Sequence, residues 1–158
     1  MTSPQSLSKA SHVPHLLIVE DNPGDVDLIL DALQQTGRAH TFATVHDGLS
    51  AIEALRKAAD DGATPDFVLL DLNIPKLDGR EVLRVIKGDP RLSHIPVAVL
   101  TSSQADRDVE QAYQLHANCF MTKPTDVRQL FDMFDTFTEF WFDTATVAFR
   151  ASPDHASD

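Results

Sequence analysis

Short apolar runs alternate with segments of helical periodicity five times along this chain, and this alternation limits the possible fold more than any other feature. The runs are four or five residues long, and several are continuous rather than alternating in polarity, which is typical of strands that are buried on both faces. The runs that we expect to be strands are residues 16–19, 41–45, 67–70, 97–100 and 118–122.

The segments between these runs have the apolar spacing of amphipathic helices. In the first segment, Val26, Ile29 and Leu33 recur at intervals of three and four residues, which places them on one face of a helix. Five strand–helix units of this length predict an α/β fold, in which helices cover both faces of a doubly wound, five-stranded parallel sheet and the crossovers are right-handed. The helical stripes lie within residues 26–33, 49–55, 82–86, 109–116 and 127–141.

The length and composition favour one globular domain with polar ends. The chain has 158 residues, of which 42% are apolar, and this is enough for a single core. We expect a folded domain over residues 14–142, a disordered tail over 1–13 and a C-terminal extension over 143–158. No apolar run is long enough to span a membrane, and the polar N-terminus has no secretory signal. The single cysteine, Cys119, cannot form an internal disulfide and favours the reducing cytoplasm.

The charge balance bears on the class of partner. The chain carries 24 acidic and 13 basic residues, a net charge of −11. Such an acidic chain gains nothing from the release of counterions at phosphates, which argues against direct binding of nucleic acid. It would accept a divalent cation wherever its acids converge. The seven histidines show no close pairing, so a zinc site has little support.

Polar residues with complementary chemistry follow four of the predicted strands. Glu20 and Asp21 follow the first strand and Asp71 follows the third, and the carboxyl ends of parallel strands share one edge of a sheet. The other side chains at this edge come from two adjacent pairs, Thr101–Ser102 and Lys123–Pro124. Three converging carboxylates need a cation, and Mg²⁺, which prefers oxygen ligands, supplies that charge. This set suits phosphoryl transfer with Asp71 as the nucleophile.

Each of these residues also has a structural interpretation. An acid after a strand is commonly the N-cap of the next helix, which applies to Asp21, and Thr101 equally suits the cap of the fourth helix. A lysine after a strand, such as Lys123, is usually a solvated surface residue. The conjunction favours the functional interpretation, because acids, a hydroxyl and an ammonium all occur at strand ends that must be neighbours.

With these residues in place, the chain resembles the response-regulator receiver domains of two-component signalling. The resemblance covers residues 14–142 and implies a flavodoxin-like, receiver-like sheet with strand order 2-1-3-4-5. The EDNPGD and DLNIPKLDG segments also resemble the small single-domain regulators that partner bacterial and cyanobacterial phytochromes, although chemotaxis-like and other orphan receivers share parts of them. The segments that carry the resemblance are LLIVEDNPGD (16–25), FVLLDLNIPKLDGREVL (67–83), VAVLTSS (97–103) and CFMTKP (119–124).

The resemblance implies a phosphoacceptor and a set of metal ligands. Asp71 is implied to accept the phosphoryl group and also to bind Mg²⁺. Asp21 is implied to bind the ion directly and Glu20 through water. The backbone carbonyl of Asn73 completes the protein's share of the coordination.

The resemblance also implies roles for residues around the phosphoryl group. Thr101 would hydrogen-bond one phosphoryl oxygen, and Lys123 would pair with another. The Lys123–Pro124 peptide is cis in the family. Phe120 occupies the family's aromatic switch position, and Ser103 lies where side chains influence self-dephosphorylation. The loop around the phosphoryl group would include Ser102, Ser103 and Pro124.

These features favour a signalling switch that takes a phosphoryl group from a histidine kinase, with a phytochrome kinase as the partner that the subfamily resemblance suggests. Hydrolysis by the domain itself would be slow. The alternative is a phosphatase of the haloacid-dehalogenase type, but that chemistry needs a second Asp two residues after the nucleophile, where this chain has Asn73. A nucleotide-binding module is disfavoured because no glycine-rich phosphate loop follows a strand. We also expect no DNA-binding output domain, because too few residues follow the last helix.

The last predicted helix carries more aromatic residues than one buried stripe requires. We expect Met133, Phe140 and Phe142 to point away from that stripe. One interpretation is that a curved helix end buries some of them against the rest of the domain. The core-facing stripe itself is filled by Phe131, Phe134, Phe137 and Trp141.

The other interpretation of these residues is a self-association surface. An apolar patch on the face made of residues 109–116, 118–122 and 127–142 resembles the usual dimer surface of the family, and a twofold dimer is the commonest closed arrangement. Residues 145–150 (ATVAFR) are β-branched and apolar enough to act as an arm onto the partner. We therefore expect a homodimer through this face.

Overall fold

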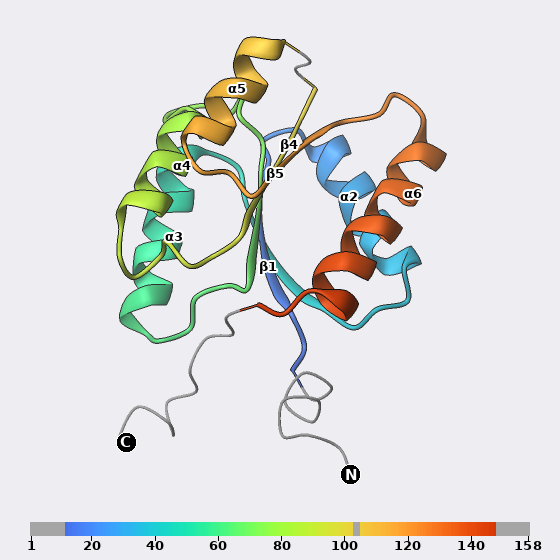
Figure 1. Cartoon of the computed structure of the whole chain (residues 1–158), viewed down its shortest axis with the longest axis horizontal. Helices are drawn as coiled ribbons and strands as arrows, with labels where there is room; N and C mark the ends of the chain where they lie inside the picture. Colours follow the sequence, from blue (N-terminus) through green and yellow to red (C-terminus); the bar gives the residue numbers. More distant parts are fainter. Residues whose placement is uncertain (1–11, 103–104, 148–158) are drawn as a thin grey trace.

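The sheet of the computed structural model, which describes residues 12–102 and 105–147, has five strands. Its order is β2-β1-β3-β4-β5, and all neighbouring strands are parallel. The predicted fold class and strand order are therefore confirmed (Figure 1). In chain order the strands are β1 His15–Val19, β2 Thr41–Val45, β3 Phe67–Leu70, β4 Val97–Thr101 and β5 Cys119–Thr122.

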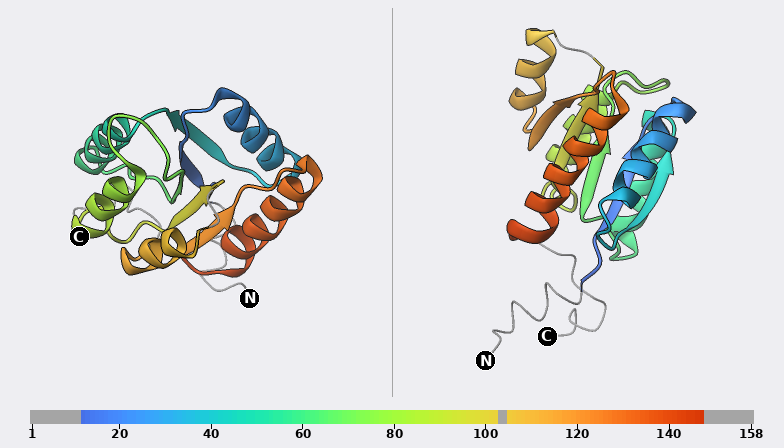
Figure 2. Two further views of the ribbon diagram at one scale, coloured as in Figure 1. Left: turned by 90° about the horizontal axis from the view of Figure 1, so that it is seen from above. Right: turned by 90° about the vertical axis from the view of Figure 1, so that its right-hand side faces the viewer.

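Helices cover both faces of this sheet. They are α2 Pro23–Gln35, α3 Gly48–Asp60, α4 Gly79–Gly88, α5 Asp106–Gln114 and α6 Val127–Thr138, and a π-helical turn, η1 Glu139–Thr144, continues α6. Figures 1 and 2 show α3, α4 and α5 on one face and α2 beside α6 on the other. Within the ranges that the structure describes, none of the helices combines the length and apolarity needed to cross a bilayer.

The core consists of two apolar clusters, one on each face of the sheet. Successive side chains of a strand point to opposite faces, so Leu17 and Val19 join one cluster while Leu16 and Ile18 join the other. Every residue of β3 and β4 is buried, which explains why these strands are continuous apolar runs. The edge strand β2, in contrast, exposes its first three residues, including Phe42.

Side-chain caps fix where most of these helices begin. At the start of α2, the side-chain oxygen of Asn22 accepts a hydrogen bond from the backbone N–H of Asp25 (3.1 Å). Each cap marks the end of the loop that follows a strand, so the residues between strand and helix stay at the carboxyl edge of the sheet. The caps of α3, α4 and α6 are Asp47, Asp78 and Asp126.

The end of α6 corrects one expectation about the aromatic residues. We expected Phe142 to point away from the core, but its ring centroid lies 5.4 Å from that of Phe67 and 6.5 Å from that of Phe137. The cause is η1, because the wide turns of a π-helix, closed by i→i+5 hydrogen bonds, bring Phe142 round to the side of the helix on which Phe137 lies. The backbone N–H of Ala145 donates to the carbonyl of Phe140 (2.6 Å) with this spacing. In an α-helix, residues 137 and 142 would lie about 140° apart.

The other residues of the expected patch differ in exposure. Met133 is partly buried against the same apolar cluster as Phe142, whereas Phe140 is 51% exposed. The expected arm, residues 145–150, lies only partly within the described part of the chain, and there Val147 packs against the core of its own chain. Of the three residues that we expected to point outward, Phe140 is therefore the one that does so.

Candidate functional site

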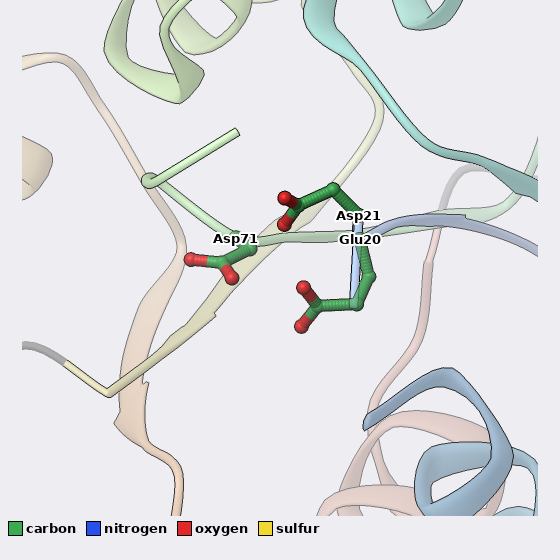
Figure 3. Close-up of side chains that lie close together, drawn as sticks. All are labelled: Glu20, Asp21 and Asp71. Atoms are coloured by element: carbon green, nitrogen blue, oxygen red, sulfur yellow. The ribbon is translucent and has the colours of Figure 1, made fainter. Parts of the chain in front are cut away.

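Three carboxylates meet beyond the carboxyl ends of β1 and β3. These strands pair with Val19 opposite Leu70, so the next residue of each strand, Glu20 and Asp71, emerges beside the other. One oxygen atom each from Glu20, Asp21 and Asp71 lies within 4.8 Å of the other two. Figure 3 shows the three carboxyl groups gathered in one space. The structure thus brings together the acids that the sequence pattern singled out.

Burial acts most strongly on Glu20. This residue is 2% exposed, whereas Asp21 is exposed to solvent. Loss of water around the carboxylate, helped by the negative charge of Asp71, raises the pKa of Glu20 to about 7, although the hydrogen bond from Lys123 opposes this change. The raised pKa of Glu20 therefore reflects first a carboxylate that is withdrawn from water and second its closeness to another acid.

Lys123, at the end of β5, is the cation of this site. Its ammonium group donates hydrogen bonds to Glu20, to Oδ2 of Asp71 (3.0 Å) and to Oδ2 of Asp25 (2.9 Å). Burial alone would lower the pKa of Lys123, but its hydrogen bonds to the carboxylates outweigh burial and raise this pKa. Lys123 therefore remains charged and directed at the acid that we expect to be phosphorylated.

Asp25 is a site residue that the sequence analysis missed. It lies in the first turn of α2, and its contact with Lys123 joins that helix to the end of β5. The contact arises because α2 packs beside α6, the helix that follows β5. The signal available in the sequence was an acid four residues after Asp21, which is also what a solvated helix turn contains.

Thr101 closes the opposite side of the site, at the end of β4. It is fully buried, and its hydroxyl oxygen accepts a hydrogen bond from the side-chain amide of Asn73 (3.4 Å). The backbone N–H of Asn73 donates to Oδ1 of Asp71 (3.0 Å). Asn73 therefore connects the hydroxyl and the carboxylate of the site.

Two glycines hold the loop that carries Asn73. A Cβ atom on Gly79 would lie 2.5 Å from the backbone carbonyl oxygen of Asp71, so only glycine allows the start of α4 to approach this closely. A Cβ on Gly48, at the start of α3, would collide with the backbone carbonyl of Leu77. The backbone after Asp71 is therefore packed between the starts of two helices.

The remaining predicted residues lie around this centre. Phe120 is half-buried against the cluster on the α3–α5 face, and its backbone N–H donates to the hydroxyl of Tyr113 (3.2 Å). Ser102 is exposed, and Ser103 lies outside the described residues. Pro124 is half-buried beside Lys123.

The peptide bond between Lys123 and Pro124 is trans, and the expectation of a cis bond is wrong for this structure. Trans is the lower-energy isomer of an X-Pro bond, by about 0.5–1 kcal/mol. The side chain of Lys123 reaches the three carboxylates with this trans bond in place.

The structural interpretations of Asp21 and Thr101 are not supported by the geometry of the helix starts. Asn22, not Asp21, caps α2. The N-cap position of α5 is Ala105, which makes no side-chain capping bond. Asp21 and Thr101 are therefore available for other contacts at the sheet edge.

The donor set fits a hard divalent cation. All three side chains of the cluster supply carboxylate oxygens, which is the donor type that Mg²⁺ and Mn²⁺ prefer over sulfur or imidazole. Three carboxylates that each supply one oxygen leave half of an octahedral shell open, and Asp21 faces solvent, so water and a phosphoryl oxygen have room to bind.

Two proteins of related sequence are similar to this chain over most of its length. Response regulator Rcp1 of Synechocystis sp. is 40% identical over 144 residues, which cover 89% of this chain and 98% of that protein. A probable methanogenesis regulatory protein of Methanothrix harundinacea, FilR2, is 39% identical over 127 residues, covering 80% of this chain and 82% of that protein.

Solved structures agree with the sequence relatives. The phosphorylated cyanobacterial phytochrome response regulator RcpA superposes with a TM-score of 0.82 at 43% identity, covering 87% of this chain and all of that one. The Mn²⁺-bound form of response regulator Rcp1 superposes with a TM-score of 0.79 at 39% identity, covering 86% of this chain and 99% of that one. The family model for the response regulator receiver domain matches residues 16–135. The chain therefore belongs to the family of response regulator receiver domains, which are signalling domains that bind divalent metal.

Proposed function

We propose that this protein is a single-domain response regulator that accepts a phosphoryl group on Asp71, with Mg²⁺ as cofactor. The observation that carries the proposal is the convergence of the Glu20, Asp21 and Asp71 oxygens within 4.8 Å, with the ammonium of Lys123 at 3.0 Å from Asp71. A nucleophilic carboxylate next to further acids and a fixed cation suits phosphoryl transfer, in which positioning and charge neutralisation do most of the catalysis.

The residues of the chain would divide the work of this transfer. An oxygen of Asp71 attacks the phosphorus, the bond from phosphorus to the donor's leaving atom breaks, and an acyl phosphate forms on Asp71. Glu20, Asp21, Asp71 and the carbonyl of Asn73 would hold Mg²⁺, which when bound supplies positive charge next to the phosphoryl oxygens. Lys123 keeps a donor directed at the same place.

The signal would leave the site through Thr101. Its hydroxyl accepts a hydrogen bond from Asn73 and would instead donate to a phosphoryl oxygen. This shift would vacate space on the β4 side, into which the half-buried ring of Phe120 would turn, so that phosphorylation biases a two-state equilibrium. Distinct Phe120 rotamers in crystals with and without a phosphoryl mimic would support this, and identical rotamers would contradict it.

The partner that we propose is a histidine kinase of the phytochrome class. The support is the similarity to RcpA, a cyanobacterial phytochrome response regulator, over 87% of this chain. A second similar structure is the bacteriophytochrome response regulator AtBRR, at 35% identity and a TM-score of 0.67. Release of the phosphoryl group would be slow hydrolysis of the acyl phosphate, because Asn73 supplies no carboxyl group to relay a proton to water.

The experiment that tests this function compares Asp71→Asn with Asp27→Asn. Asp27 is an exposed acid on α2, so its substitution controls for the loss of one negative charge. With acetyl phosphate and Mg²⁺, we expect labelling of the wild type and of Asp27→Asn but not of Asp71→Asn. Full labelling of Asp71→Asn would overturn the assignment, and labelling that persists in EDTA would overturn the role of the metal.

We also propose a homodimer through the face formed by α5, β5 and α6. The support is the exposed ring of Phe140 in η1, the turn that continues α6, where this ring is in edge contact with Trp141 (5.2 Å between ring centroids). Sedimentation at micromolar concentration tests it: Phe140→Glu should convert the dimer into a monomer. A monomeric wild type in both phosphorylation states would refute the dimer.

A further inference from the structure

The ammonium group of Lys123 has three N–H donors, and each is directed at a different carboxylate. Two of these acceptors, Glu20 and Asp71, belong to the metal cluster. The third, Asp25, does not belong to it and comes from a different element, the first turn of α2. Its role therefore has to be sought in the lysine rather than in the metal.

Packing alone does not hold the stem of Lys123 in place. A cavity of about 30 Å³ lies beside it, with Leu28, Leu100 and Leu130 in its walls and Asp25 and Lys123 at its polar end. This volume is on the order of one water molecule, so apolar packing leaves a gap of that size beside the lysine. Lysine has many rotamers, and an unrestrained ammonium would spend part of its time away from Asp71.

The backbone of Asp25, in contrast, is well fixed. Its backbone N–H is bonded to the capping oxygen of Asn22 (3.1 Å), and its helix packs against α6. The side chain of Asp25 is 37% exposed, and that of Lys123 is 13% exposed. The ion pair at 2.9 Å therefore adds, from an anchored helix turn, a third restraint on an ammonium that already donates to Glu20 and Asp71.

We propose that Asp25 is a positioning residue for Lys123. By accepting one N–H, it fixes the rotation of the ammonium, so that a second N–H stays aimed at Asp71 before and during phosphoryl transfer. This inference rests on the proposed function, because it assigns Asp25 to the phosphoryl-transfer site. The conformational entropy of the lysine side chain is then already lost before the phosphoryl donor binds.

Two substitutions of Asp25 can separate the effect of its acceptor geometry from the effect of its negative charge. An asparagine keeps an acceptor oxygen at this position but removes the negative charge that competes with the phosphoryl group for the lysine. An alanine removes both. A positioning role therefore predicts that Asp25→Asn is phosphorylated at least as fast as the wild type, and that Asp25→Ala is slower by about three- to tenfold.

The experiment measures the rate constant for labelling by acetyl phosphate in excess Mg²⁺, by intact-protein mass spectrometry, for both variants and for Asp27→Ala. Asp27 lies two residues further along the same helix and is exposed, so Asp27→Ala is expected to match the wild type. The dissociation constant for Mn²⁺, from electron paramagnetic resonance, should change less than the labelling rate in Asp25→Ala. The NMR signal of the Lys123 ammonium should broaden in Asp25→Ala and persist in Asp25→Asn.

Three outcomes overturn the proposal: equal rates in all variants, equal slowing of both Asp25 variants, or faster labelling of Asp25→Ala. The second would assign the effect to charge, and the third would make Asp25 a competitor of the phosphoryl group. The proposed function fails differently, through a wild type that is not labelled or an Asp71→Asn that is. The ammonium signal then still decides whether Asp25 orders Lys123.

Discussion

Two partly buried lysines stand at opposite edges of the sheet, and their partners differ in charge. Lys123, at the carboxyl edge, donates to three carboxylates. Lys87, near the end of α4, donates at the amino edge to neutral oxygens: the carbonyls of Ser93 (3.2 Å) and Ile95 (2.8 Å) and the side chain of Asn118 (3.1 Å). The two ammonium groups are therefore fully bonded in different ways.

The difference separates a structural role from a chemical one. Burial lowers the pKa of Lys87, whereas the carboxylates raise the pKa of Lys123 in spite of its burial. At the amino edge, the hydrogen bonds from Lys87 to neutral oxygens connect the segments that lead into β4 and β5. At the carboxyl edge, three carboxylates bind one ammonium and Asp21 lies in the same cluster, so the acids outnumber the cation and the site is prepared for a metal ion.

The largest effect should come from removing each ammonium in turn. Lys123→Met should slow labelling by acetyl phosphate by about 100-fold, because the developing charge on the phosphoryl oxygen loses its fixed cation. It should also tighten Mn²⁺ binding, since the acids lose their internal positive charge. Lys87→Met should be labelled like the wild type. Equal loss in both variants would abolish the distinction between the two lysines.

The second-largest effect should be a pH dependence of Mn²⁺ binding at the carboxyl edge. Because Glu20 has a pKa of about 7, protons compete with the metal below neutrality, and the dissociation constant for Mn²⁺ should rise about tenfold from about pH 8 to about pH 6. Glu20→Gln should bind Mn²⁺ more weakly but with little pH dependence in this range. A wild-type affinity that does not change over this range would contradict the assignment.

The raised pKa of Glu20 also makes the free energy of unfolding of the metal-free protein depend on pH. The folded chain holds the Glu20 proton more tightly than the unfolded chain does, because the pKa of Glu20 in the unfolded chain is near 4.5. This contribution to the free energy of unfolding is fully present below that value and is lost as the pH rises through about 7. Titration of the metal-free protein by thermal unfolding, with Glu20→Gln as the control, checks the direction.

The smallest effect should be on stability at the amino edge. Lys87→Met leaves the carbonyl of Ile95 and the side chain of Asn118 with fewer donors and should lower the free energy of unfolding by about 1 kcal/mol. The matched Arg84→Met, on the exposed face of the same helix, should cost less. Urea unfolding measures both. A stability loss confined to Arg84→Met would show that Lys87 does not tie the two segments.

Sequence patterns were enough for the fold because two periodicities coexist in the chain. Strands buried on both faces leave uninterrupted apolar runs, such as the four residues of β3, and helices leave stripes, so the elements and their alternation can be read directly. The position of Glu20 beside Asp71 then follows, because the carboxyl ends of parallel strands share an edge. Resemblance to a family supplied the strand order.

Other parts of the site depend on packing that no local pattern encodes. The contact between Asp25 and Lys123 requires α2 to lie beside α6, so the two residues meet across 98 positions of sequence. The choice between Asp21 and Asn22 as the cap of α2 depends on where the backbone turns after β1, and both residue types cap helices well. Phe142 was misplaced because the 3.6-residue period was extended into a segment with a longer period.

The π-helical turn η1 also implies that the chain carries one residue there that the fold does not use. Phe137 and Phe142 lie on the same face although they are five positions apart, whereas in an α-helix residues three or four positions apart share a face. Deletion of Phe140 should therefore straighten the turn into an α-helix and leave Phe142 packed on Phe67. The length of this segment, rather than the apolar character of the helix, then determines that an aromatic ring is displayed to solvent.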